Sequence, residues 1–148
     1  MYQVGWSHGI EKFQGKPDFM KGSFYANVLF DEYESPLHAK MRNRWPSEII
    51  PDLEHAFKNL SRLMFRVGGL LSFHIDKYVH SIVPTYEMGK LSKIFNQDNQ
   101  RIIGRLLHYF PVDKPQEKTE DLTYCGWHND HSSLTALTKA MYIDKNGN

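Results

Sequence analysis

A long helical pattern of apolar residues constrains the fold of this chain more than any other feature. Between Ile50 and Ile82, apolar side chains recur every three or four positions: Ile50, Leu53, Phe57, Leu60, Met64, Val67, Leu71, Ile75, Tyr78 and Ile82. This spacing places them on one face of an α-helix. Ser47 can cap the start of the helix, and Pro84 cannot continue it. We therefore expect a scaffold helix over residues 47–83.

The burial of this apolar face is a second expectation. Amphipathic helices usually bury their apolar stripe in their own domain, so we expect the stripe to be core and not a groove for a partner. Gly68-Gly69 can kink or divide the helix, because glycine is a weak helix former.

The helix separates two zones of different character. Residues 1–46 are rich in aromatics and glycine without a sustained period, and we expect a loop-rich segment in which 21–27 is a packed surface loop. Residues 102–110 are rich in β-formers and precede Pro111, which predicts a strand. After a polar connection at 112–123, the residues 124–138 and 141–144 predict further strands.

Composition limits the possible partners and the compartment. The 148 residues carry 18 Lys and Arg against 17 Asp and Glu, a formal charge of +1. One domain of this length and charge has no field that would recruit nucleic acid or an anionic membrane, so we expect a small-molecule partner. The single cysteine, Cys125, fits a reducing compartment and is expected to be inert. With no export or membrane-spanning signal, we expect a cytoplasmic protein.

Two His-x-Asp pairs are candidates for metal binding, and local geometry separates them. His74 and Asp76 lie within the predicted helix, where side chains two positions apart diverge by about 200°. His128 and Asp130 lie in a predicted strand, where side chains two positions apart share a face. One imidazole and one carboxylate, joined by a second imidazole, form the facial triad of non-haem Fe(II) oxygenases. The alternative is a surface hydrogen-bonded pair.

The flanking residues resemble a known family. The run Gly-Arg-Leu-Leu-His-Tyr-Phe-Pro at 104–111, followed by Gly-Trp-His-Asn-Asp-His-Ser-Ser-Leu-Thr-Ala-Leu-Thr at 126–138, is similar to the 2-oxoglutarate and Fe(II)-dependent oxygenases. The closest branch is the isopenicillin N synthase-like group. The long helix and the early segments at 5–8 and 21–27 also resemble that group, so the similarity covers most of the chain.

The resemblance implies a fold and a set of site residues. The fold is α+β and mainly β, a double-stranded β-helix or jelly roll with a long supporting helix, whose first strands occupy residues 101–148. His128 and Asp130 would be the first two Fe(II) ligands. His108 matches a position that contacts the co-substrate 2-oxoglutarate, and Phe110 would line the pocket. Phe110 departs from the usual Tyr and has no hydroxyl to offer.

The resemblance also implies parts that this chain does not contain. The family's second iron-binding His and its Arg-x-Ser pair for 2-oxoglutarate lie well downstream of the His-x-Asp strand, whereas the sequence ends at Asn148. His131 is a poor substitute, because an odd neighbour on a strand points to the opposite face. We therefore expect a partial domain, a fragment of a longer oxygenase that is inactive alone.

The expected activity of the intact enzyme is oxidation of a small organic substrate, by hydroxylation or desaturation, with dioxygen and 2-oxoglutarate consumed. Two other enzymatic activities remain open: oxidation of a peptide thiol without 2-oxoglutarate, and hydrolysis at a zinc site. A different class is a non-catalytic, degenerate barrel that acts as a binding or interaction protein.

Overall fold

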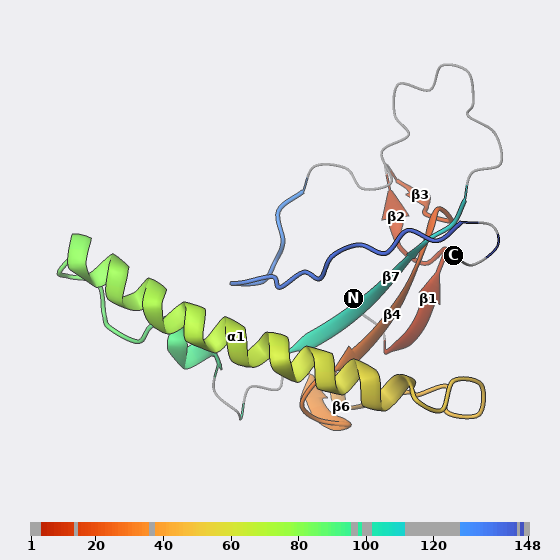
Figure 1. Cartoon of the computed structure of the whole chain (residues 1–148), viewed down its shortest axis with the longest axis horizontal. Coiled ribbons are helices and arrows are strands. Elements are labelled where there is room, and N and C mark those ends of the chain that lie inside the picture. Colours follow the sequence, from red (N-terminus) through yellow and green to blue (C-terminus); the bar gives the residue numbers. More distant parts are fainter. Residues whose placement is uncertain are drawn as a thin grey trace, which may run out of the picture.

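The computed structural model describes residues 4–13, 15–35, 38–95, 98, 102–111, 128–144 and 146. Within these ranges the chain is α+β, with one α-helix beside small antiparallel sheets and without a closed barrel (Figure 1). No helix in the described ranges is long and apolar enough to cross a membrane.

Among the described residues, three antiparallel sheets and one long helix make up the fold. The largest sheet has the strand order β1-β4-β7, and two-stranded sheets pair β2 with β3 and β5 with β6. The elements are β1 (Gly5–His8), β2 (Lys12–Phe13), β3 (Lys16–Pro17), β4 (Lys21–Asn27), β5 (Glu32–Ser35), β6 (His38–Arg42), α1 (Leu53–Ile82), the short 3-10 helix η1 (Ser92–Phe95) and β7 (Ile103–Tyr109).

Strand β4 is the centre of the fold, so the expectation of a surface loop at 21–27 is wrong. It pairs with β1 on one side and with β7 on the other, and residues 22–27 are all buried. Gly22 leaves room for the indole of Trp6, because a Cβ at position 22 would lie 2.1 Å from that ring. The glycine and aromatic residues that suggested a loop are needed here for close packing across the sheet.

The hydrophobic core lies between β4 and the start of α1. Phe24, Ala26 and Val28 alternate along one face of the strand and pack against Phe57 of the helix. Trp45 completes an aromatic cluster, with ring centroids 5.5 Å from both Phe24 and Phe57. Such tilted and edge-to-face contacts stabilise a core beyond the area they bury.

The helix begins later than the sequence predicts. It runs from Leu53 to Ile82, and the residues from Ser47 to Asp52 form turns instead. Pro51 explains the difference, because it has no amide hydrogen and its ring would clash with the carbonyl four residues earlier in a helix that started at Ser47. Gly68 neither kinks nor divides α1: it makes room for Phe95 of η1, whose ring a Cβ at position 68 would meet at 2.8 Å.

The apolar stripe of α1 is only partly core, which corrects the expectation for its outer half. Phe57 is buried, whereas Leu60, Val67, Leu71, Tyr78 and Ile82 are exposed. Figure 1 shows why: the first turns of α1 lie against the large sheet, and the later turns extend beyond it.

A buried carboxylate fixes the segment that follows the helix. Asp76 is fully buried and accepts hydrogen bonds from the Tyr86 hydroxyl (2.6 Å), from the backbone N–H groups of Leu91 (3.0 Å) and Ser92 (2.9 Å), and from the Ser92 hydroxyl. Burial alone would raise the pKa of Asp76, but these donors stabilise the charged form and hold its pKa far below the usual value.

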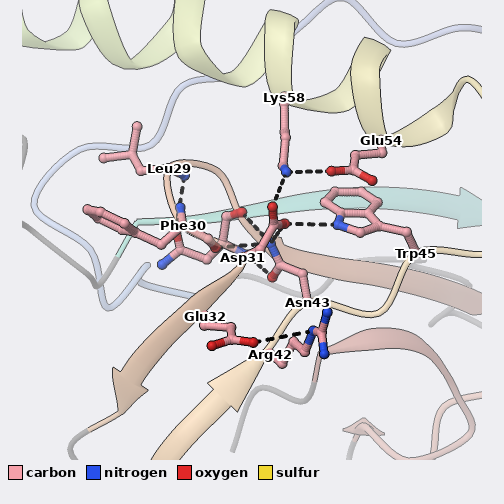
Figure 2. A network of polar contacts seen from close by, with 10 residues as sticks. Leu29, Phe30, Asp31, Glu32, Arg42, Asn43, Trp45, Glu54 and Lys58 are labelled. Carbon is pink, nitrogen blue, oxygen red and sulfur yellow. Dashed lines mark hydrogen bonds and ion pairs between the residues drawn. The ribbon is translucent and has the colours of Figure 1, made fainter.

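A second polar cluster, centred on Asp31, joins three elements (Figure 2). Its carboxylate accepts from Lys58 of α1 (2.5 Å), from the Trp45 indole (3.1 Å) and from the Asn43 amide (3.2 Å). Burial alone would raise the pKa of Asp31 and lower that of Lys58, but the ion pair shifts both the other way. The cluster thereby ties the hairpin β5-β6 to the helix.

In the C-terminal part of the chain, one predicted strand is present in the structure and the later ones are not. The predicted strand over 102–110 is confirmed as β7. In contrast, residues 128–144 contain no strand, although strands were predicted over 124–138 and 141–144. Their side chains are almost all exposed, and strand geometry is stable only when a neighbouring strand supplies hydrogen bonds. Residues 124–127 lie outside the described ranges.

We predict that Asp31→Asn lowers the free energy of unfolding by about 1–2 kcal/mol, because Lys58 loses its closest anion while Glu54 still neutralises part of its charge. Urea denaturation at pH 7 measures the change. The matched control is Glu32→Gln in the next residue, whose ion pair with Arg42 is exposed, and which should change stability by less than about 0.5 kcal/mol. An equal effect of both substitutions would contradict the role given to Asp31.

We also predict that Asp76 makes the fold acid-sensitive. A carboxyl with a lowered pKa stabilises the fold fully above its ordinary value of 3.8, and this stabilisation is lost as the pH falls toward the folded-state pKa. The melting temperature should therefore drop below about pH 4. Asp76→Asn should lower the melting temperature at pH 7 by about 2–6 °C and flatten its acid dependence. Parallel curves for the two proteins would refute this assignment.

Candidate metal centre

His128 and Asp130 face each other in the described C-terminal segment. The Nε2 atom of His128 lies 3.3 Å from Oδ1 of Asp130. The backbone here is irregular and not a strand, so the two side chains converge through local turns and not through the two-residue repeat of a sheet. The pair predicted from sequence therefore forms, but for a different reason.

Thr135 holds the second carboxylate oxygen. Its hydroxyl donates to Oδ2 of Asp130 over 2.5 Å and lies 2.8 Å from the Ser132 hydroxyl. The bond from Thr135 and, with a smaller effect, the charge of His128 lower the pKa of Asp130. Asp130 is thus an oriented anion, with Oδ2 engaged and Oδ1 directed at the imidazole.

The distance between the two donor atoms fits a shared metal ion. Two donors that each lie about 2.1 Å from one first-row metal are about 3.0 Å apart at right angles and about 3.4 Å apart in a tetrahedron. The observed 3.3 Å falls in this interval. A hydroxyl that orients the non-coordinating carboxylate oxygen is a usual companion of a metal ligand.

The same pair also meets the definition of a surface ion pair. The side chains of His128 and Asp130 are 59% and 50% exposed, so this site is open to water and not a dry pocket. In the described ranges, no group of three or more His, Cys, Asp or Glu residues is arranged to hold a metal. The chain therefore presents at most a two-residue chelate in these ranges.

His131 has a weak electrostatic influence on Asp130. Its charge adds to the lowering of the Asp130 pKa, after the larger effects of Thr135 and His128. Residues 128–144 form no strand, so the alternation of faces that would direct His131 away from His128 does not apply to the observed backbone.

The helical His-x-Asp pair diverges as its spacing predicts. Asp76 is buried toward the segment after the helix, whereas His74 is exposed on another side of α1 and packs edge-on against Phe73. The two side chains do not converge on one point. This pair offers a matched comparison for the exposed one.

His108 and Phe110 belong to an aromatic cluster at the end of β7. Their ring centroids are 4.7 Å apart, and the ring centroid of His8 also lies 4.7 Å from that of Phe110. The sheet register explains the meeting, because His8 and His108 both pair with Gly22 of the central strand. His8 is fixed by its Nε2 atom, 3.0 Å from the carbonyl oxygen of Phe19.

The two predicted groups have different neighbours among the described residues. His108 packs against Phe110, and Phe110 also packs against His8, whereas Asp130 approaches His128 and is bonded to Thr135. In Figure 1 the light-blue start of the C-terminal segment lies apart from β7.

Two residues that the sequence did not single out, His8 and Thr135, contact predicted site residues. His8 reaches Phe110 only through the pairing of β1 and β7 with β4. The order Asp-x-Ser-x-x-Thr was the available signal for the bond of Thr135 to Asp130. Cys125 and Trp127 lie outside the described ranges.

Comparison with known proteins returns no match to a protein-family model, to a curated protein or to a solved structure. The resemblance to the oxygenases therefore rests on the sequence motifs of this chain, above all the runs at 104–111 and 126–138.

Proposed function

We propose that this chain carries two ligands of a non-haem iron site and belongs to a 2-oxoglutarate- and Fe(II)-dependent oxygenase with a jelly-roll fold. The observation that supports the proposal is the 3.3 Å approach of His128 Nε2 to Asp130 Oδ1, with Thr135 bound to the other carboxylate oxygen. An imidazole and a carboxylate at this separation are two of the three groups of the facial triad.

In this proposal each residue has a defined task. His128 and Asp130 hold Fe(II), and Thr135 keeps the Asp130 carboxylate turned so that Oδ1 remains available. The bound iron would supply oxidation of a small organic substrate with dioxygen and 2-oxoglutarate. His108 would donate a hydrogen bond to 2-oxoglutarate, and Phe110 would form an apolar wall beside it.

The proposed metal site is tested by titrating the purified chain with Fe(II) under anaerobic conditions, and with Mn(II) as a paramagnetic probe in NMR spectra. We expect weak binding that selectively broadens the signals of residues 128–135. His128→Gln and Asp130→Asn should each abolish this broadening. The matched control is His74→Gln, in the helical pair with the same sequence spacing, which should leave binding unchanged. Equal broadening in all four proteins would exclude the site.

The same titration separates catalysis from binding alone. Adding 2-oxoglutarate to the Fe(II) complex should produce a weak visible charge-transfer band, because the co-substrate chelates iron through its oxo acid group. His108→Ala should weaken the band without changing Fe(II) binding. Fe(II) binding without any such band would favour the non-catalytic barrel, and the absence of both would leave His128 and Asp130 as a surface ion pair.

The hydroxyl of Thr135 gives a further prediction. Thr135→Val keeps the shape of the side chain but removes the donor to Asp130 Oδ2, so metal affinity should fall about tenfold, as when other outer-shell partners are lost. Thr138→Val, in the same segment, is the control and should bind as the wild type. Unchanged affinity in Thr135→Val would show that Asp130 needs no orienting partner.

A further inference from the structure

The face of the large sheet that points away from the hydrophobic core carries a cluster of charged and hydroxyl side chains. Lys21, Ser23 and Tyr25 occupy alternate positions of β4. Arg105 of β7 is the register partner of Tyr25. Successive side chains of a strand point to opposite faces, so all four lie on the face opposite to the core residue Phe24. Strand pairing alone therefore brings two cations and two hydroxyl groups together.

These groups converge on one carboxylate, which comes from another part of the chain. Glu11 precedes β2, and its Oε1 atom accepts from the Tyr25 hydroxyl and from Arg105 Nη2 (2.9 Å). The same nitrogen donates to Oε2 over 2.8 Å, and Lys21 Nζ lies 3.7 Å from that oxygen. Burial alone would raise the pKa of Glu11, but the Tyr25 hydrogen bond and the two cations lower it. The cluster thus stabilises a carboxylate in its charged form.

Contacts within the sheet hold the donors in place. The Nε and Nη2 atoms of Arg105 donate to the Ser23 hydroxyl over 3.1 and 2.7 Å. The guanidinium carbon of Arg105 lies 5.0 Å from the centroid of the Tyr25 ring. Ser23 and Tyr25 are 1% and 3% exposed. Because buried donors are costly when they are unpaired, this base would bind another carboxylate if Glu11 withdrew.

The segment that carries Glu11 is a small hairpin outside the large sheet. Among the described residues, β2 and β3 pair only with each other, and in Figure 1 they lie near the start of β4. The side chains of Glu11 and Arg105 are 34% and 31% exposed, so water reaches this ion pair. A carboxylate in solution can therefore compete with Glu11 for the same donors.

We propose that Tyr25, Arg105 and Lys21 form a binding site for the carboxylate group of a small organic acid, and that Glu11 occupies this site as an internal competitor. An external carboxylate takes over the hydrogen bonds from Tyr25 and Arg105 and releases the hairpin β2-β3 from the sheet. The inference does not rest on the proposed metal site, because Arg105 and His108 lie on opposite faces of β7.

The first test removes the internal carboxylate and adds external ones. Glu11→Ala should lower the melting temperature, and sodium acetate should restore it more than sodium chloride at equal ionic strength, because a bound ligand stabilises the fold. Sodium phosphate should restore it less, since one guanidinium nitrogen here serves both oxygens of a flat group. Equal restoration by acetate and phosphate would assign the site to anions in general, against the proposal.

The matched control for this test is Glu32→Ala, which removes an exposed carboxylate from its pair with Arg42. It should show no response that is specific to acetate. An equal acetate response of both variants, or none in either, would overturn the proposal. If Glu11→Ala is unfolded in chloride, recovery of the folded circular dichroism spectrum in acetate becomes the readout, and failure to recover counts against the site.

Double variants assign the donors. In the Glu11→Ala background, Arg105→Gln should abolish acetate binding, measured by NMR titration, and Tyr25→Phe should weaken it about tenfold, because each removes a hydrogen bond to a charged group. Arg42→Gln in the same background is the control and should leave acetate binding unchanged. Acetate binding that survives Arg105→Gln would overturn the assignment.

The wild-type protein tests whether an outside ligand displaces Glu11. Acetate and glutarate should bind at least about tenfold more weakly than to Glu11→Ala, because a tethered carboxylate has a high effective concentration. As they bind, the NMR signals of the Arg105 Nε–H and of the Lys12 and Lys16 amides should shift together. Binding without a change at Lys12 and Lys16, or no binding to the wild type at saturating carboxylate, would make Glu11 a permanent structural partner and refute the proposal.

Discussion

The fold depends on a buried polar connection between Asn27 and Asn43. The backbone N–H of Asn27 donates to the side-chain oxygen of Asn43 at 2.8 Å, and the Asn43 amide donates back to the Asn27 carbonyl at 2.9 Å. The side-chain oxygen of Asn27 then accepts from the N–H groups of Leu29 and Phe30. Because buried polar groups are costly when unpaired, these bonds fix where β4 ends and how the chain reaches Asp31. Lys58 can then join the helix to the hairpin.

The sequence predicted those elements whose signal is local. The helix and β7 follow from periodicity and β-formers, and the end of the helix follows from Pro84. Strand β4 differs from its prediction because its formation depends on tertiary contacts. Gly22 and Ser23 suit a strand only when β1 and β7 cover both of its edges. The helix α1 begins after Ser47 because Pro51 interrupts the segment between them. The outer helix stripe was read as core because periodicity reports an apolar face and not what covers it.

The approach of His128 to Asp130 was predictable from the sequence, but the backbone that produces it was not. The spacing of His128 and Asp130 led to a correct expectation of convergence through an incorrect strand geometry. Its main support, the bond from Thr135 to Asp130, depends on a turn that no periodic pattern encodes. The contact of His8 with Phe110 joins residues far apart in the sequence, which only the register of the sheet determines. Contacts between residues near each other in the sequence could thus be predicted, whereas contacts between distant residues could not.

The pairing of β4 with β7 has a consequence for synthesis of the chain. Ser23 and Arg105 are hydrogen-bonded partners 82 residues apart, and everything between them must be made before the central strand gains its second neighbour. At about 5–20 residues per second, a ribosome needs on the order of 4–16 seconds for that stretch. During this interval Phe24 and Ala26 lie on a strand with an open edge, the form most prone to pair with other nascent chains. The newborn protein therefore passes through a period in which a chaperone would have its strongest effect on yield.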